Sequence, residues 1–254
     1  MIVVVTGASS GIGYDIAKLY SDMGHEVIGI ARRKDRLDKL KKEMNEKCKV
    51  ISMDLSVREN CYKLYEQLKE KDIDILINNA GFGIIDEFKN VELDKELEMI
   101  DLNICTVHIL TKLFLNDMIQ KNKGYILNVA SIASVFPCGP YFSTYYATKS
   151  YVSSMTLAIN KELKDMNSKV KVGCLYPGPV ETEFNEKSGV KFTTKAISSE
   201  KLARITIKNI EKGKTKIIPG MSNKLLLLFV RLFPEKVITY LNAKMQLSKK
   251  SKIH

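Results

Sequence analysis

The chain has 254 residues and a formal net charge of +11, with 45% hydrophobic and 27% charged residues. This is the composition of a soluble globular protein that is large enough for one domain with an ample core. The five cysteines are odd in number, widely spread and without a C-x-x-C pair, which argues against a disulfide framework or a zinc site and predicts free thiols in the cytoplasm. The apolar start "IVVV" is too short for a secretion signal, and no apolar stretch is long enough to span a membrane.

The excess positive charge lies in the carboxyl-terminal part of the chain. Residues 201–254 hold 13 Lys and Arg against 2 acidic residues, whereas residues 1–200 hold 27 of each sign. The lysines alternate with leucine and isoleucine instead of forming a basic face with aromatic residues. Nucleic-acid binding is therefore not expected.

Short β-branched runs alternate with amphipathic segments along the first 220 residues. We expect strands at 2–5, 26–31, 49–53, 74–78, 124–129, 170–176 and 216–219, and helices at 12–23, 34–46, 56–71, 94–120, 147–166 and 199–212. This alternation predicts an α/β fold with a doubly wound parallel sheet, the Rossmann fold, as a single domain over residues 1–220. Such a sheet binds ligands beyond the carboxyl ends of its strands, so functional residues should directly follow strands.

The stretch "TGASSGIG" (6–13) follows the first expected strand and opens the first helix. Gly7 allows a sharp turn, Gly11 lets a pyrophosphate approach the backbone, and Gly13 lets the helix and strand pack closely. The spacing is G-x-x-x-G-x-G rather than the commoner G-x-G-x-x-G, and glycines also make ordinary turns. The position after the first strand nevertheless indicates a nucleotide phosphate site.

The second expected strand ends in "ARR", with Ala31 where a dinucleotide fold usually has an acid for the ribose 2′-hydroxyl. Arg32 and Arg33 follow, and two guanidinium groups suit a 2′-phosphate, which an acid would repel. The pattern favours NADP(H) over NAD(H), although a solvated basic turn would look the same. After the third strand, Asp54 could bond the adenine amino group and Leu55 could offer backbone contacts.

Three further motifs follow strands: "NNAG" (78–81), "NVASIAS" (128–134), which places Ser131 at the carboxyl edge, and "YPGPVETEF" (176–184). Within "STYYATKSY" (143–151), only Tyr145 has a lysine four positions away, so Lys149 lies one turn along the same helix face. An ammonium about 4 Å from a phenolate stabilises it by roughly 4 kcal/mol, or about three pKa units. We therefore expect Lys149 to bring the pKa of Tyr145 near neutrality; the alternative is a surface Tyr–Lys pair.

Taken in order, T-G-x-x-x-G-I-G, N-N-A-G, a serine after the fifth strand, Y-x-x-x-K and P-G-P-V-x-T resemble the short-chain dehydrogenase/reductase family over roughly residues 1–185. The resemblance implies a ketoreductase with Ser131, Tyr145, Lys149 and Asn103 as catalytic residues. It also implies a set of cofactor-binding residues: Gly7, Ser9, Ser10, Gly11, Ile12, Gly13, Arg32, Arg33, Asp54, Leu55, Asn79, Ala80, Gly81, Tyr145, Lys149, Pro177, Gly178, Val180 and Thr182.

By this resemblance, Tyr145 protonates the alkoxide that forms on a carbonyl substrate, Ser131 holds the carbonyl oxygen, and Asn103 holds a water that returns the proton. Relatives are usually homodimers or homotetramers. Ser131 precedes Tyr145 by 14 positions, one more than is typical of the family, and the loop 136–143 could absorb the extra residue; Ser134 is the alternative serine. No metal site is expected, because the three histidines, His25, His108 and His254, are scattered.

Two alternatives to a reductase remain on the same fold: a non-catalytic NADP(H)-binding redox sensor or regulator, and an epimerase, whose glycine spacing differs. Retention of the tyrosine, lysine and serine favours catalysis. The preferred substrate is a hydrophobic ketone, such as a 3-oxoacyl chain or a sterol-like oxo compound, but a small ketone also fits.

By the same resemblance, residues 183–212 occupy the position in which family members carry a substrate lid. Residues 221–254 form a basic amphipathic extension. Its apolar run 225–230 is broken by Arg231, and apolar residues then recur at helical spacing from 237 to 245. This extension could close the substrate pocket or form a subunit interface. It could instead rest on an anionic lipid surface, as a peripheral membrane contact over 222–254, or recognise a partner.

Overall fold

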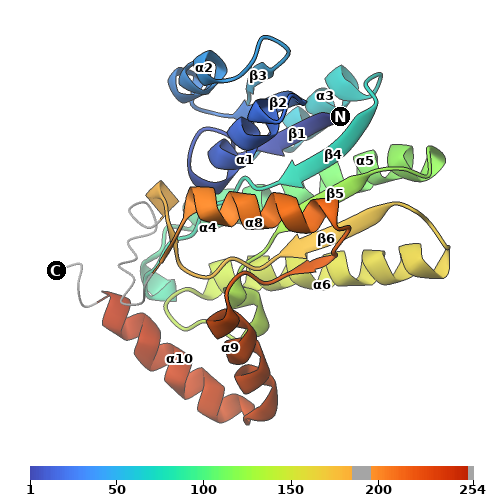
Figure 1. Cartoon of the computed structure of the whole chain (residues 1–254). Coiled ribbons are helices and arrows are strands. Elements are labelled where there is room, and N and C mark those ends of the chain that lie inside the picture. Colours follow the sequence, from blue (N-terminus) through green and yellow to red (C-terminus); the bar gives the residue numbers. More distant parts are fainter. Residues whose placement is uncertain (185–195, 251–254) are drawn as a thin grey trace.

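The computed structural model describes residues 1–184 and 196–250 (Figure 1). Its centre is a parallel sheet of seven strands in the order β3-β2-β1-β4-β5-β6-β9. The strands are β1 (Ile2–Thr6), β2 (Glu26–Ala31), β3 (Lys49–Ser52), β4 (Ile73–Asn78), β5 (Tyr125–Val129), β6 (Lys171–Leu175) and β9 (Lys216–Ile217). The order reverses between β1 and β4, which confirms the predicted doubly wound sheet and locates its ligand crevice beyond these strand ends.

Helices cover both faces of the sheet, as the apolar strands require. Side chains of α1 (Gly11–Asp22), α2 (Lys34–Glu43) and α8 (Ser199–Glu211) share one core cluster with Val3 and Val5 of β1. Side chains of α3 (Arg58–Leu68), α5 (Thr106–Gln120) and α6 (Ser143–Asp165) share a second cluster with Val4. Alternate residues of β1 thus enter opposite layers, as the two-residue period of a strand dictates.

The helix expected over 94–120 is built from three pieces: α4 (Leu93–Ile100), a π-helical turn η2 (Asp101–Cys105) and α5. Single π turns inside α-helices often mark functional sites, and this one carries Asn103. Helix α6 begins at Ser143 rather than at 147, so Tyr145 lies in its first turn. Two short 3₁₀ turns, η1 (Phe88–Asn90) and η3 (Ile132–Val135), precede α4 and α6.

The end of the chain contains a small second sheet, which the sequence patterns did not predict, and the helical extension that was expected over residues 221–254. Strands β7 (Val180–Glu181) and β8 (Ile197–Ser198) pair as a small second sheet. Helices α9 (Met221–Leu232) and α10 (Glu235–Lys250) form a pair at one end of the molecule, well away from α2 and β3 (Figure 1). Over the described ranges, no helix is both long and apolar enough to cross a bilayer.

The predicted lid is only partly visible. Residues 185–195, its centre, lie outside the described residues. Its second half forms α8, whose Leu202, Ala203 and Ile207 are buried in the core cluster shared with α1. Phe184 and Ile197 of the predicted lid line the crevice, together with residues of α9 and α10.

Candidate active site

A cavity of about 980 Å³ runs along the carboxyl edge of the sheet. Its lining includes residues that follow β1, β2, β3, β4, β5 and β6, so the motifs that were separate in the sequence meet in one place. Every predicted site residue lines this cavity except Gly13 and Asn103. Gly13 lies beneath the glycine-rich turn, against Gly7 and Asn79, and Asn103 lies behind Gly81.

The glycine-rich turn is held in place by the "NNAG" motif. The Asn79 side-chain amide donates to the carbonyl of Thr6 (3.1 Å), and the Thr6 hydroxyl accepts from the backbone N–H groups of Asn79 (3.0 Å) and Ala80 (3.1 Å). Gly7 has φ 70°, and a Cβ there would lie 2.8 Å from the Asn79 amide nitrogen. Only glycine fits at this position.

The first helix begins at the cavity wall, where its N-terminus can receive a phosphate. The Arg33 guanidinium donates to the hydroxyl of Ser9 (3.1 Å) and of Ser10 (2.9 Å), and to the carboxylate of Glu183 (2.7 Å). Both serine hydroxyls keep their own protons for an incoming acceptor. A positive charge, two hydroxyl donors and a helix N-terminus together fit the phosphates of a dinucleotide.

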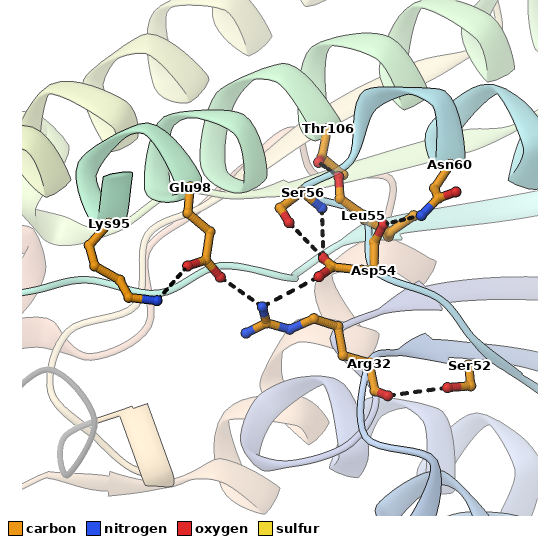
Figure 2. Close-up of polar contacts among 9 residues, drawn as sticks. All are labelled: Arg32, Ser52, Asp54, Leu55, Ser56, Asn60, Lys95, Glu98 and Thr106. Carbon is orange, nitrogen blue, oxygen red and sulfur yellow. Dashed lines mark hydrogen bonds and ion pairs between the residues drawn. The ribbon is translucent and has the colours of Figure 1, made fainter. Parts of the chain in front are cut away.

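Unlike Arg33, Arg32 does not contact the glycine-rich turn but points toward the carboxylates of Asp54 and Glu98, as Figure 2 shows for Arg32. Its guanidinium donates to Glu98 of α4 (2.7 Å) and lies 3.5 Å from the Asp54 carboxylate. Asp54 also accepts from the backbone N–H (3.0 Å) and the hydroxyl (2.7 Å) of Ser56. Burial acts to raise the pKa values of Asp54 and Glu98, but these hydrogen bonds and the charge of Arg32 outweigh it and hold both pKa values below their ordinary range.

At the other end of the cavity, Ser131, Tyr145 and Lys149 are all buried and close to one another. Ser131 directly follows β5 and accepts from the N–H of Ala133 (3.1 Å). The Tyr145 ring stacks on Phe142, with ring centroids 4.4 Å apart. The Lys149 amine donates to the carbonyl of Val129 (2.9 Å) and lies 5.9 Å from the centroid of the Tyr145 ring.

The predicted pKa of Tyr145 is wrong. Burial raises the pKa of the Tyr145 hydroxyl to about 12, and its hydrogen bond with Ser131, rather than the charge of Lys149, acts to lower it. Burial also lowers the pKa of the Lys149 amine to about 8. The sequence-based estimate counted the attraction between the two groups but not the cost of removing both from water, which is the larger effect here.

Asn103 is fully buried in the π-helical turn. Its side-chain oxygen accepts from the N–H of Phe82 (3.1 Å), and its amide donates to the Phe82 carbonyl (2.9 Å) and the Thr148 hydroxyl (3.1 Å). A Cβ on Gly81 would lie 2.8 Å from the Asn103 oxygen and 3.3 Å from the Lys149 amine. Asn103 thus clamps the segment after β4 against α6, and its role in holding a water stays a prediction.

The positions of the two serines favour Ser131 over Ser134. The Ser134 hydroxyl donates back to the carbonyl of Ser131 (2.6 Å), and Ser134 does not line the cavity, whereas Ser131 does. The loop between Ser131 and Tyr145 contains Tyr141 at φ 64°, a left-handed conformation that few non-glycine residues adopt. This unusual turn lies where the extra residue was expected.

Several residues that line the cavity could not be assigned to the site from the sequence. Phe136, Phe142 and Phe184 form an apolar wall near Tyr145, and Leu226 of α9 and Met245 of α10 border the same cavity. Each residue is unremarkable within its own segment. Only the fold, which brings the end of the chain back to η3 and α6, shows that these side chains share a site.

The sheet topology and the cavity define a dinucleotide-dependent oxidoreductase, and the chain belongs to the short-chain dehydrogenase/reductase family. The short chain dehydrogenase family matches residues 1–193. The chain is 34% identical over 196 residues to an NADP-dependent 3-hydroxy acid dehydrogenase, YdfG, of Salmonella typhi, covering 76% of this chain and 77% of the relative.

Two further likenesses come from a duck enzyme and a bacterial structure. Over 198 residues the chain is 34% identical to a very-long-chain 3-oxoacyl-CoA reductase of Anas platyrhynchos, covering 74% of this chain and 62% of the relative. It superposes with a TM-score of 0.79 on a short-chain dehydrogenase from Sphingobium yanoikuyae in complex with NADPH, at 27% identity, covering 87% of this chain and 88% of that one.

Proposed function

We propose that the protein is an NADPH-dependent reductase of a hydrophobic ketone. The observation that carries this proposal is a single cavity with Arg32 and Arg33 at one end and the buried set of Ser131, Tyr145 and Lys149 at the other. When bound, the nicotinamide of the cofactor supplies the hydride. The residues of this chain have to hold the dinucleotide, orient the ketone and supply the proton.

Preference for NADPH is supported by Ala31, Arg32 and Arg33. The neutral side chain at 31 leaves space where an acid would repel a 2′-phosphate, and the two guanidinium groups lie on the cavity wall beside it. The relative YdfG is named as NADP-dependent, and the Sphingobium yanoikuyae structure holds NADPH. Both agree with this preference.

Tyr145 acts in this proposal as the proton donor. Because burial raises its pKa to about 12, the phenol stays protonated at neutral pH, as a general acid must. An alkoxide is far more basic than a phenolate, so proton transfer to it remains favourable. Ser131, which hydrogen-bonds the Tyr145 hydroxyl, is placed to hold the carbonyl oxygen and to stabilise the phenolate left behind. The Lys149 amine lines the same cavity, where its charge can hold the ribose of the cofactor.

A hydrophobic substrate is supported by the walls around Tyr145. Phe136, Phe142 and Phe184 line the cavity close to Tyr145 and Tyr146, and Leu226 and Met245 come from the helices at the end of the chain. The Anas platyrhynchos relative is named for a very-long-chain 3-oxoacyl substrate. A long acyl or sterol-like ketone would bury more of its surface against these walls than a small ketone could.

The test is an assay that follows NADPH absorbance with 3-oxoacyl thioesters, oxo-steroids and small ketones, repeated with NADH. We expect turnover with a long-chain or steroid ketone and a preference for NADPH. Tyr145→Phe should lower turnover by about 10²- to 10⁴-fold while NADPH affinity, measured by fluorescence, changes less than about twofold. Tight NADPH binding without turnover by the wild type on the whole panel would support the regulatory alternative instead.

We also propose a homo-oligomer assembled through α5 and α6, and a cytoplasmic location. Tyr151 and Leu157 are exposed on α6, and the Tyr151 hydroxyl lies 2.7 Å from the imidazole Nδ1 of His108 on α5. The five cysteines are free thiols, as in a reducing compartment. Light scattering of the wild type and of Leu157→Glu tests the assembly, with a lower mass expected for the variant.

A further inference from the structure

Exposed apolar side chains are concentrated on the last two helices. Of the 21 large hydrophobic residues that are exposed in the described parts of the chain, 11 lie on α9, α10 and the short link between them. On α9, Met221, Leu225, Leu228 and Leu232 are between 55% and 71% exposed. Their spacing of four, three and four residues places them in one stripe along the helix.

Helix α10 is amphipathic, but its polar face is turned toward the protein body. Asn242 and Gln246 are each only 1% exposed. The Asn242 amide donates to the carbonyl of Cys138 (2.7 Å), and the Gln246 amide donates to the hydroxyl of Tyr146 (2.6 Å). The helix is therefore attached through these polar contacts and through the buried Ile238 (2% exposed), next to the proposed proton donor.

The opposite face of α10 is apolar and exposed. Val237, Tyr240, Leu241 and Leu247 are between 42% and 68% exposed. A helix on a water-soluble protein normally turns such residues inward and its amides outward. An inverted orientation on α10, together with the stripe on α9, indicates that a second apolar medium covers these helices.

The positive charge of α9 and α10 indicates which of two partners, a second copy of the chain or an anionic lipid surface, covers their apolar face. Residues 221–254 hold 7 Lys and Arg and a single acid, Glu235, and Lys224, Lys236 and Lys244 are exposed beside the apolar side chains. A second copy of the chain would bring two such positive surfaces together, which is unfavourable. An anionic lipid surface attracts lysines and accepts apolar side chains at once.

Aromatic residues mark the same region. The rings of Phe229 and Phe233, at the junction of α9 and α10, lie 4.2 Å apart, and Tyr240 is exposed on α10. Aromatic side chains favour the boundary between lipid headgroups and acyl chains. We propose that the exposed face of α9 and α10 binds peripherally to a membrane surface that contains anionic lipids.

The cavity gives this membrane contact a use. Leu226 and Met245 border the cavity, and Met245 is also 39% exposed, so the cavity wall and the outer apolar face meet at this side chain. A protein docked through α9 and α10 would hold this side of its cavity toward the lipid. Lipid binding itself does not depend on the reaction proposed above and is tested without it.

The experiment is sedimentation of the full chain with vesicles of phosphatidylcholine alone or mixed with phosphatidylglycerol. Four proteins are compared: the wild type, Leu225→Asp/Tyr240→Asp, Lys224→Gln/Lys236→Gln/Lys244→Gln, and the control Tyr62→Asp/Met166→Asp. The control removes two apolar side chains that are also exposed but lie elsewhere, on α3 and after α6. Circular dichroism checks that each protein is folded.

We expect the wild type and the control to bind the anionic vesicles and to bind the neutral ones far less. Affinity should fall about fivefold for each lysine removed and by a larger factor when Leu225 and Tyr240 become acidic. Failure of the wild type to bind either vesicle overturns the proposal, as does unchanged binding of the variants. If vesicles do not bind but the Leu225→Asp/Tyr240→Asp variant loses an oligomer, the occupant is a second copy of the chain.

Discussion

Arg32 donates a 2.7 Å hydrogen bond to Glu98, a residue 66 positions further along the chain. Asp54 approaches the same guanidinium to 3.5 Å, so an arginine at the cofactor cavity is shared by two carboxylates (Figure 2). A 2′-phosphate that approached Arg32 would have to compete with both of them. Glu98 is the member of this group that comes from α4, outside the nucleotide-binding motifs.

Replacing Glu98 by Gln should therefore strengthen NADPH binding. The change removes a negative charge that competes for Arg32, and an exposed ion pair of this kind is worth up to about 1 kcal/mol, or about fivefold in affinity. NADH, which has no 2′-phosphate, should bind with nearly unchanged affinity. Fluorescence titration of both nucleotides measures the two dissociation constants.

Glu92→Gln is the matched control, because it makes the same charge change at an exposed position just before α4. Its affinity for both nucleotides should equal that of the wild type. Weaker NADPH binding by Glu98→Gln would mean that Glu98 positions Arg32 for the phosphate rather than competing with it.

A pH profile tests the state of Lys149. Because burial lowers its pKa to about 8, the amine is charged below this pH and loses its charge as pH rises through it. Tyr145, with a pKa raised to about 12, stays protonated over the same range. The kcat/KM for ketone reduction should therefore fall with increasing pH, with a midpoint near the pKa of Lys149.

Lys149→Arg tests whether loss of charge at position 149 causes the alkaline decline, since a guanidinium keeps its charge across the measured pH range. The variant should have a lower kcat/KM, because its branched guanidinium cannot reproduce the hydrogen bond of the Lys149 amine to the Val129 carbonyl. Its remaining activity should not fall near pH 8. An alkaline decline that persists unchanged in the variant would assign the titration to another group.

Gly7 and Gly24 distinguish two reasons for a glycine: a left-handed backbone conformation and a lack of space for a Cβ atom. Both have positive φ, 70° and 83°, but a Cβ on Gly7 would meet the Asn79 amide at 2.8 Å, whereas one on Gly24 would meet no atom within 4 Å. Gly24→Ala should cost only the left-handed strain of alanine, about 1–2 kcal/mol. Gly7→Ala should cost more and should also weaken NADPH binding. Thermal unfolding and nucleotide titration of both variants make the comparison, and equal losses would show that the contact with Asn79 does not matter.

The arrangement of the sheet could be predicted from the sequence because it depends on local patterns. Apolar runs fixed the seven main strands, and residues that follow parallel strands must meet at one edge. That is why Ser131 and the glycine-rich turn could be assigned to one site before the fold was known, whereas Tyr145 was added to this site by the family resemblance. The contact between Arg32 and Glu98 could not be predicted, because no sequence pattern near either residue indicates that the two lie together.

The burial of Tyr145 and the orientation of α10 could not be predicted from the sequence either. The pKa of Tyr145 depends on how completely its hydroxyl is removed from water, which the spacing to Lys149 does not show. For α10 the sequence predicted an amphipathic helix, but not which face meets the body. Asn242 and Gln246 hold the polar face of α10 against the body through hydrogen bonds to Cys138 and Tyr146, which lie about 100 positions earlier in the chain.

Asn242 should therefore control how α10 closes the cavity. Asn242→Ala removes the amide that bonds the Cys138 carbonyl and leaves that carbonyl without its 2.7 Å partner, a loss of about 1 kcal/mol for a partly buried hydrogen bond. Looser docking of α10 displaces Met245 and Gln246 from the cavity wall, so KM for a hydrophobic ketone should rise while NADPH affinity stays constant. Ser248→Ala is the control, since the Ser248 hydroxyl is exposed and bonds the Met245 carbonyl within the helix. Steady-state kinetics and thermal unfolding of both variants provide the test, and a KM unchanged by Asn242→Ala would show that α10 does not shape the substrate site.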